Sequence, residues 1–310
     1  MARPTGLKVI ENKYCYNVWE AYMEDGKETF SSVEKEFSQR RDVELYHLCG
    51  IYDRAGLPVE TVEPDYRPGS AEQPYKVLTR AFSDEVYSGV AAGKAVLVAG
   101  GYCNYAPAIL GGLQRAVGTD KRLGVIWVDA HSDNQIVEDF DEPIRLVGVP
   151  VSTMLGQTLP GYRKEVCGLE KPLDGRNMII SDARITLEDE EANMRSASVV
   201  RLTGEQFEDP ATWKAAVQSL AERVDHIYFS VDVDILKPEY IPAYEVLSPG
   251  GHDIEKVMEN IGVVMDTGKV NVMSVFCVDF DHYENGGEWT YLSGMKVIAS
   301  ALSRWSEIPE

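Results

Sequence analysis

Basic residues, cysteines and long apolar runs are all scarce in this sequence of 310 residues. Its 30 Lys and Arg face 50 Asp and Glu, so the chain carries a formal net charge of −20. Such a surface repels nucleic-acid phosphates, and we expect no nucleic-acid partner. No apolar run approaches the roughly 18 residues that cross a bilayer, so we expect no membrane association either.

The cysteines and the amino terminus indicate a cytoplasmic protein. The five cysteines are odd in number and widely scattered, which is not the pattern of a disulfide framework. The first ten residues contain two basic side chains but neither a long apolar stretch nor a small-residue cleavage site, unlike a secretory signal. We therefore predict reduced thiols and a cytoplasmic location.

Short apolar runs alternate with longer helical patterns along the chain. The runs are rich in β-branched residues and are bounded by polar residues or glycine, as buried parallel strands are. We expect helices over residues 212–224, 254–265 and 289–305, the second capped by Asp253. The predicted strands are residues 7–10, 95–99, 125–128, 178–180, 227–231 and 270–275.

This alternation predicts an α/β fold, in the form of a three-layer α/β/α sandwich with a mainly parallel central sheet. Hydrophobic residues make up 44% of the chain and charged residues 26%, which is typical of a globular domain. No repeat or linker divides the chain, so we predict a single domain over residues 1–310, with loop-rich stretches at 61–73 and 138–175. Ligands bind at the carboxyl ends of strands in such sheets, so the residues after each run are candidates for chemistry.

Two of these strand ends carry clustered carboxylates. Asp129, His131 and Asp133 follow one strand, and their alternation would project all three side chains to one side. Asp232 and Asp234 follow another strand with the same spacing. An alternative interpretation of the first cluster is that its residues are the N-cap and turn residues of the following helix. Together, however, four carboxylates and one imidazole predict a hard-donor metal site, large enough for two bridged ions.

A third strand end carries a glycine pair and a cysteine. Gly100 and Gly101 permit a tight turn that aims Cys103 inward. The motif by itself leaves open whether Cys103 binds a metal or is a small buried residue.

Together these motifs resemble those of the ureohydrolase family, which comprises arginases, agmatinases and formiminoglutamases. The family pattern is Gly-Gly-Asp-His-Ser, then Asp-Ala-His-x-Asp, then Ser-x-Asp-x-Asp-x-x-Asp-Pro-x-x-x-Pro-Ala. The resemblance is clear from residue 95 onward and implies an arginase-like fold. The corresponding segments here are Gly100-Gly101-Tyr102-Cys103-Asn104, Asp129-Ala130-His131-Ser132-Asp133, and residues 230–238 followed by Pro242-Ala243.

The resemblance implies a hydrolase with two divalent ions, usually Mn²⁺. A hydroxide held between the ions attacks the central carbon of a small cationic guanidino, N-hydroxyguanidino or formimino substrate, and urea or a urea-like product leaves. Asp133 would orient that hydroxide through a hydrogen bond. The family also implies a homo-oligomer, either a trimer or a hexamer. The implied ligands are Asp129 and Asp232 between the ions, His131 and Asp234 at one ion, and Asp133 and Cys103 at the other.

Two departures from the family pattern affect the chemistry. Cys103 stands where the family has a ligand His, as it does in some hydroxyarginine-hydrolysing relatives. A thiolate is a softer ligand, which shifts the metal preference toward Zn²⁺ or Fe²⁺. Val147 stands where arginases have a proton-shuttle His, so the leaving group must be protonated in another way. An N-hydroxyguanidine would need that proton less.

The substrate-contacting positions depart further. Gln135 falls where arginases bind the amino-acid carboxylate with Asn. Asp279 aligns with the Glu that binds the guanidinium group, and Asp281 is a nearby substitute. His252 and Glu245 lie in a loop that borders the active site in the family. We expect His252 to donate a proton and Glu245 to bind substrate or donate a proton.

Two other functions fit the same residues. Asp129, His131 and Asp234 resemble the single-zinc arrangement of related deacetylases, which would make the chain an amidohydrolase with one ion. Loss of the ligand His and of the shuttle His also fits a catalytically silent relative. Against the silent reading, the buried carboxylate cluster has no structural benefit without an ion.

Overall fold

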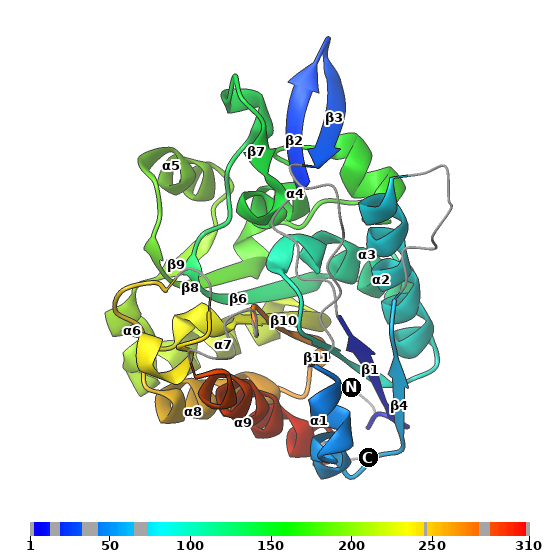
Figure 1. The fold of residues 1–310 in the computed structure, drawn as a ribbon, viewed down its shortest axis with the longest axis vertical. Helices are drawn as coiled ribbons and strands as arrows, with labels where there is room; N and C mark the ends of the chain where they lie inside the picture. Colours follow the sequence, from blue (N-terminus) through cyan, green and yellow to red (C-terminus); the bar gives the residue numbers. More distant parts are fainter. Residues whose placement is uncertain are drawn as a thin grey trace.

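The computed structural model describes residues 3–12, 19–32, 43–64, 73–244, 247–278 and 286–307. An eight-stranded sheet runs through the centre of the protein (Figure 1), and every pair of neighbouring strands in it is parallel. In order across the sheet, the strands are β4 (Val59–Val62), β1 (Leu7–Glu11), β5 (Ala95–Ala99), β11 (Val270–Phe276), β10 (His226–Asp232), β6 (Leu123–His131), β8 (Met178–Ile185) and β9 (Val200–Leu202).

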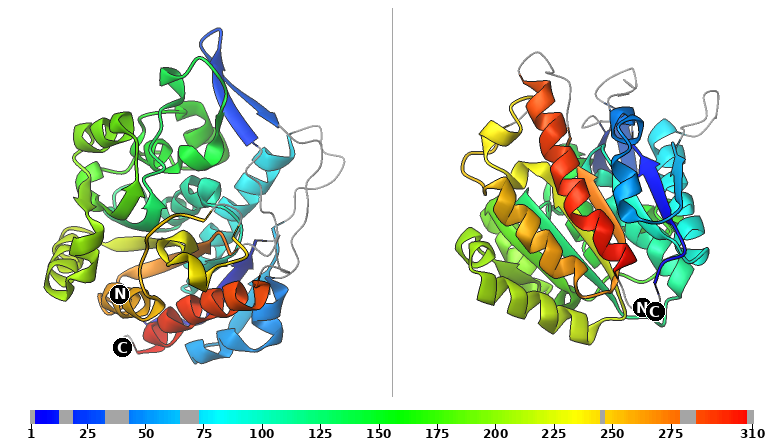
Figure 2. Two further views of the ribbon diagram at one scale, coloured as in Figure 1. Left: turned by 60° about the vertical axis from the view of Figure 1, so that its left-hand side comes forward. Right: turned by 90° about the horizontal axis from the view of Figure 1, so that it is seen from below.

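Helices cover both faces of this sheet. The chain passes from β5 to β6 in one direction across the sheet and from β9 through β10 to β11 in the other. Right-handed crossovers therefore place α3 (Ala106–Val117) on one face and α7 (Pro210–Arg223) and α8 (Ile254–Met265) on the opposite one. α2 (Pro74–Ala91) packs beside α3, and α9 (Gly287–Ser306) packs beside α8, as the view from below in Figure 2 shows. The predicted three-layer α/β/α architecture is confirmed.

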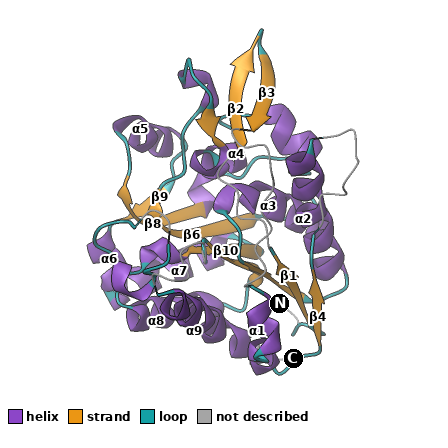
Figure 3. Cartoon of the chain, viewed as in Figure 1, coloured by secondary structure: helices purple, strands orange, loops and turns teal. Residues whose placement is uncertain are grey.

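A smaller antiparallel sheet projects from one end of the molecule. It consists of β3 (Lys27–Ser32), β2 (Trp19–Glu24) and β7 (Ile144–Arg145), and the β2–β3 hairpin extends farthest from the central sheet (Figures 1 and 3). Nothing in the sequence analysis predicted this sheet. The remaining helices are α1 (Glu44–Leu48), α4 (Pro150–Leu155), α5 (Glu188–Ser196) and α6 (Gly204–Glu208). Among the described helices, none is long and apolar enough to cross a membrane.

All six predicted strands are present, because each apolar run lies between two helical layers. The side chains of Val96, Leu97 and Val98 in β5, for example, are fully buried. The loop-rich stretch 138–175 also contains β7 and α4. One detail differs from prediction. α8 begins at Ile254 as expected, but Asp253 does not cap it through its side chain, which instead pairs with Lys237 Nζ at 2.8 Å.

Candidate metal centre

The end of β6 brings two acidic side chains and a histidine to the carboxyl edge of the sheet. The pairing of β6 with β8 shifts register between Asp129 and His131, and Asp133 has a φ of +47°. Simple strand alternation therefore does not place the three side chains, because the backbone turns between them. The carboxylate of Asp129 accepts a hydrogen bond from the backbone N–H of His131 at 2.7 Å, which fixes this turn.

The end of β10 supplies the other two carboxylates. Asp232 is the last residue of the strand, and Asp234 lies in the 3₁₀ turn Val233–Ile235 that follows. The Asp232 carboxylate accepts a hydrogen bond from the Asp234 N–H at 3.0 Å. One oxygen of Asp234 accepts a hydrogen bond from the Ala130 N–H, also at 3.0 Å. This last bond joins the two strand ends directly.

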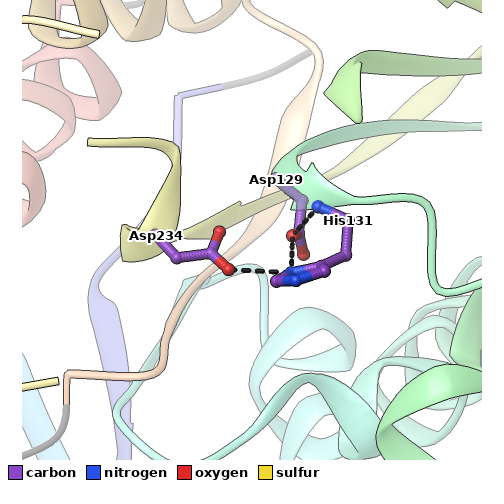
Figure 4. A group of neighbouring side chains, drawn as sticks. All are labelled: Asp129, His131 and Asp234. Atoms are coloured by element: carbon purple, nitrogen blue, oxygen red, sulfur yellow. Dashed lines mark hydrogen bonds and ion pairs between the residues drawn. The ribbon is translucent and has the colours of Figure 1, made fainter. Parts of the chain in front are cut away.

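Asp129, His131 and Asp234 form a compact group (Figure 4). His131 Nδ1 lies 2.8 Å from Asp234 Oδ2 and 3.5 Å from Asp129 Oδ1. The three side chains can each offer one ligand atom within 4.8 Å of the other two. Within the described ranges, no other set of three His, Cys, Asp or Glu residues meets that distance. Two of the predicted ligands from β6 and one from β10 are thus brought together.

The buried carboxylates at the two strand ends have too little positive charge beside them to balance their own charges. Burial raises the pKa of Asp129 well above its usual value, and the neighbouring Asp234 and Asp133 raise it further. Burial also raises the pKa of Asp232 well above its usual value, and the neighbouring Asp234 and Asp129 raise it further. Burial lowers the pKa of His131, but Asp129 and Asp234 outweigh that effect and raise it to about 12. Among the described residues of this group, the His131 imidazolium is therefore the one positive charge that faces these mutually repelling carboxylates.

A divalent cation fits this donor set. Asp129 is 1% exposed, and its Oδ2 atom is buried without a hydrogen-bond partner. Leaving a buried carboxylate oxygen unpaired is costly unless a cation binds it. Carboxylate oxygens with one imidazole suit Mn²⁺, Zn²⁺ or Fe²⁺.

A cavity of about 380 Å³ opens beside the group. It is large enough for a small polar molecule, and its wall includes four of the predicted ligands together with Gln135 and Val147. Its lining consists of Tyr102, Cys103, His131, Asp133, Gln135, Arg145, Val147, Gly148, Ile185, Thr186, Leu187, Glu190, Asp232, Tyr244 and Cys277.

The glycine turn after β5 places Cys103 on this wall. Gly100 and Gly101 both have positive φ, and a Cβ on Gly101 would collide with the side chain of Asn12. Cys103 is 4% exposed, and its thiol donates a hydrogen bond to the Val147 carbonyl oxygen at 3.6 Å and lies beside Asp133. The expectation that the glycine pair aims Cys103 inward is confirmed.

His252 does not line the cavity, although the sequence predicted that this residue would donate a proton to the substrate. Its ring is buried, with Nδ1 2.5 Å from Glu208 and Nε2 3.3 Å from Asp182. The ring also packs 4.7 Å from that of Phe207, and His252 is absent from the cavity lining. Its backbone accepts a hydrogen bond from the Lys237 N–H, so the residue supports the turn after β10 instead of facing the cavity.

Three other predicted substrate residues, Glu245, Asp279 and Asp281, lie outside the described residues. Four cavity residues were missed: Arg145, Glu190, Tyr244 and Cys277. Glu190 sits in an acidic run that reads as the first turn of a helix, and it does occupy that turn of α5. The other three carry no spacing signal, because their place on the wall depends on contacts between remote segments.

The comparisons with known proteins agree with this geometry. The family model for the arginase family matches residues 23–303. The arginase of Emericella nidulans is 24% identical over 269 residues, covering 84% of this chain and 82% of the relative. The formimidoylglutamase of Nocardia farcinica is 26% identical over 167 residues, covering 54% and 47%. The Bacillus caldovelox arginase structure has a TM-score of 0.76 at 17% identity and covers 96% of this chain and 98% of that one. The chain belongs to the arginase family.

Proposed function

We propose that this protein is a divalent-metal-dependent hydrolase that cleaves a C–N bond of a guanidino, N-hydroxyguanidino or formimino substrate and releases urea or a urea-like product. The observation that carries the proposal is the joining of two strand ends by Asp129, His131 and Asp234 beside a cavity. Family membership supports the reaction class, since arginases and a formimidoylglutamase are among its relatives.

The cations would be held by the carboxylates at the two strand ends. Asp129 and Asp232 would contribute to both ions, and His131 and Asp234 would complete one ligand set. The second set would contain Asp133 and Cys103, which contact each other on the cavity wall. Bound divalent cations supply Lewis-acid activation of water and lower its pKa.

Asp133 is the residue proposed to handle the proton. Its carboxylate lies on the cavity wall beside Cys103. A carboxylate there would orient the attacking water, take its proton, and pass that proton to the departing nitrogen. Without a cation, burial raises the pKa of Asp133 to about 8, against the opposing influence of His131 and Cys103. A carboxylate within reach of the attacking water and of the leaving group can accept a proton and return it.

The substrate would enter as a cation. The chain is strongly acidic. Glu190 adds a buried carboxyl group to the cavity wall, where it accepts a hydrogen bond from the Leu187 N–H at 2.8 Å. Acidic walls concentrate a guanidinium or amidinium ion. The apolar side chain of Val147 also lines the cavity and offers no proton. We therefore propose that an N-hydroxyguanidine, whose leaving group needs less protonation, is the preferred substrate.

A substrate screen tests this function. The purified protein is incubated with Mn²⁺, Zn²⁺ or Fe²⁺ and with guanidino, N-hydroxyguanidino and formimino compounds, and urea, hydroxyurea, ammonia and formamide are measured. We expect metal-dependent release of one of these products, fastest with N-hydroxyguanidines. Equal turnover of plain and N-hydroxylated guanidines would refute the substrate preference. No product from any compound with any metal would refute the function.

A second candidate is a single-ion amidohydrolase of the deacetylase type. It is favoured by one observation, namely that only Asp129, His131 and Asp234 reach mutual ligand distance within the described part of the chain. The two candidates predict different products. Acetate release from an acetylated amine with one Zn²⁺ per chain would support the single-ion enzyme over the two-ion one.

A further inference from the structure

Arg184 donates a hydrogen bond to the backbone of one residue of the candidate metal group. Its Nη2 atom lies 2.8 Å from the carbonyl oxygen of Asp234. Arg184 belongs to β8 and Asp234 follows β10, and β6 lies between these two strands in the sheet. The long side chain therefore joins the ends of two strands that are not neighbours.

An irregularity in the pairing of β8 with β6 precedes this contact. Asp182 of β8 lies opposite Asp129 of β6. Ile185 lies opposite His131, so β8 advances from 182 to 185 while β6 advances only from 129 to 131. The extra residue on β8 is a bulge, which changes the direction in which nearby side chains point. Arg184 lies within the bulge, and its guanidinium group reaches past β6 to the turn after β10.

Two further partners hold the guanidinium group of Arg184. Nε donates a hydrogen bond to the Pro249 carbonyl oxygen at 2.8 Å, and Nη1 pairs with the carboxylate of Asp182. The Arg184 side chain is 17% exposed and that of Asp182 only 4%. A planar guanidinium donates in several fixed directions, so one orientation of the side chain makes all three contacts. Asp182 also balances a positive charge that would otherwise repel a cation bound nearby.

Asp234 has its backbone and one carboxylate oxygen fixed by hydrogen bonds. Its N–H donates to Asp232 at 3.0 Å, and its Oδ1 accepts from the Ala130 N–H at 3.0 Å. Its carbonyl oxygen accepts from Arg184. The remaining atom, Oδ2, faces His131 Nδ1 at 2.8 Å (Figure 4). Of these four contacts, only the one with Arg184 comes from outside the two strand ends that carry the metal group.

We propose that Arg184 is a positioning residue, which directs the Asp234 carboxylate toward the metal through its hydrogen bond to the Asp234 carbonyl oxygen. The proposal rests on the proposed function, because it concerns a ligand of the same metal centre. Arg184 is not among the described residues that line the cavity, so it acts through Asp234 and not on the substrate. Groups that orient metal ligands contribute about 10- to 100-fold to metal affinity.

Titration of Arg184→Met with Mn²⁺ tests this role. Methionine removes all three contacts, and we expect the dissociation constant of Mn²⁺ to rise about 10- to 100-fold. Removal of a positive charge would by itself strengthen cation binding, so weaker binding identifies lost positioning and not lost charge. Arg184→Lys keeps the charge but not the fixed directions of the guanidinium group, and should restore the affinity only in part. Unchanged Mn²⁺ affinity in Arg184→Met would overturn the proposal.

Arg163→Met is the matched control for loss of stability. Arg163 is 5% exposed and donates hydrogen bonds to the carbonyl oxygens of Leu169 and Glu170, and none of these three residues lines the cavity. Melting in chelator measures how far each variant destabilises the fold. We expect both variants to melt at lower temperature, but only Arg184→Met to lose Mn²⁺ affinity. An equal loss of affinity in both would assign the effect to general destabilisation.

Hydrogen exchange in the metal-free protein provides a measurement that needs no bound ion. The Ala130 N–H is protected while the Asp234 carboxylate stays in place to accept its hydrogen bond. In chelator, we expect this amide to exchange faster in Arg184→Met than in Arg163→Met, as nuclear magnetic resonance would show. Equal exchange in the two variants would contradict the positioning role. A wild-type protein that binds no Mn²⁺ would refute the proposed function, whereas faster Ala130 exchange in Arg184→Met would still show that Arg184 positions Asp234.

Discussion

The backbone N–H of Cys277 donates a hydrogen bond to the carbonyl oxygen of Gly101 across a distance of 2.7 Å. This bond ties the turn after β5, which leads to Cys103, to the end of β11, and both cysteines line the cavity. The turn itself depends on Gly101, whose φ is +75° and whose missing Cβ leaves room for Asn12. A residue with no side chain therefore allows the turn that places Cys103 on the cavity wall.

Gly101→Ala is expected to weaken Zn²⁺ binding as well as the fold. A Cβ at this position meets Asn12 and is strained by the positive φ, at a cost of about 1–3 kcal/mol in unfolding free energy. Gly26→Ala is the matched control, since Gly26 has a φ of +73° and open space around it. Thermal melting and Zn²⁺ titration of both variants check the prediction. Normal zinc affinity in Gly101→Ala would show that the turn does not position the ligands.

Asp234→Asn is expected to lose metal binding without loss of stability in the metal-free state. The amide oxygen of Asn still accepts the Ala130 hydrogen bond, and a negative charge that raises the pKa of Asp129 is removed. The His131 imidazolium loses its pair with Asp234 but keeps Asp129 as a partner, which offsets that loss. Melting in chelator should therefore give a variant at least as stable as the wild type. With metal added, only the wild type should gain stability, by about 2.7 kcal/mol at 100 times the dissociation constant.

The exposed pair of Asp225 and Arg122 provides the control for that experiment. Asp225→Asn removes one carboxylate at a distance from the cavity lining and should retain the full stabilisation by metal. If Asp234→Asn and Asp225→Asn gained equally from added metal, Asp234 would not be a ligand.

The stability of the metal-free protein should fall as the pH rises through about 8. Burial raises the pKa of Asp133 from its ordinary value of 3.8 to about 8. Between these values the folded state keeps a proton that the unfolded state has lost. The resulting stabilisation is complete below pH 3.8 and disappears as the pH passes 8.

Melting temperatures measured across this pH range, with chelator and with Mn²⁺, check the effect. The fall in stability up to pH 8 should be present in chelator, weaker with Mn²⁺, and smaller in metal-free Asp133→Asn, in which Asp129 and Asp232 still titrate with raised pKa values. A slope of the same size in Asp133→Asn would assign the titration to another group.

His252→Gln should affect stability much more than turnover. Burial lowers the pKa of His252, but Asp182 and Glu208 outweigh burial and raise it overall. The imidazolium therefore stabilises the folded state fully below its unfolded value of 6.5, and this contribution is lost as the pH rises through the folded value. We expect a loss of about 1–3 kcal/mol at low pH, shrinking as the pH rises. A large fall in kcat with unchanged melting would instead make His252 the proton donor.

Val147→His should restore a proton donor to the cavity wall. A general acid contributes about 10²–10⁴-fold to a reaction that needs one. Turnover of plain guanidines should therefore rise relative to N-hydroxyguanidines, as steady-state kinetics on both substrates would show. A Val147→Leu variant controls for the change in volume. Equal gains on both substrate types, or none, would argue against a missing proton at this position.

The strands and the acidic cluster could be predicted from local pattern, because both signals lie within a few consecutive residues. Asp129, His131 and Asp133 were predicted to converge; Asp129 and His131 do so, whereas Asp133 lies on the cavity wall outside their compact group. Simple strand alternation does not explain their positions, because the pairing register shifts between Asp129 and His131 and because Asp133 has a left-handed backbone conformation. Such a turn has no sequence signature in non-glycine residues.

The place of Cys277 on the cavity wall could not be predicted, for a different physical reason. Cys277 meets the site because β11 lies beside β5, and the order of strands in a sheet is set by packing of the whole chain. Arg145 likewise reaches the cavity from the unpredicted antiparallel sheet. The predicted single domain over residues 1–310 and the roles of Glu245 and Asp279 stay predictions.

Counting the ions bound per chain tests the central claim most directly. The protein is loaded with Mn²⁺ or Zn²⁺, passed through a desalting column, and analysed for metal by mass spectrometry alongside Asp234→Asn. The account predicts that the wild type retains up to two ions per chain and that Asp234→Asn retains fewer. A wild-type protein that keeps no divalent ion, although fully folded, would contradict it.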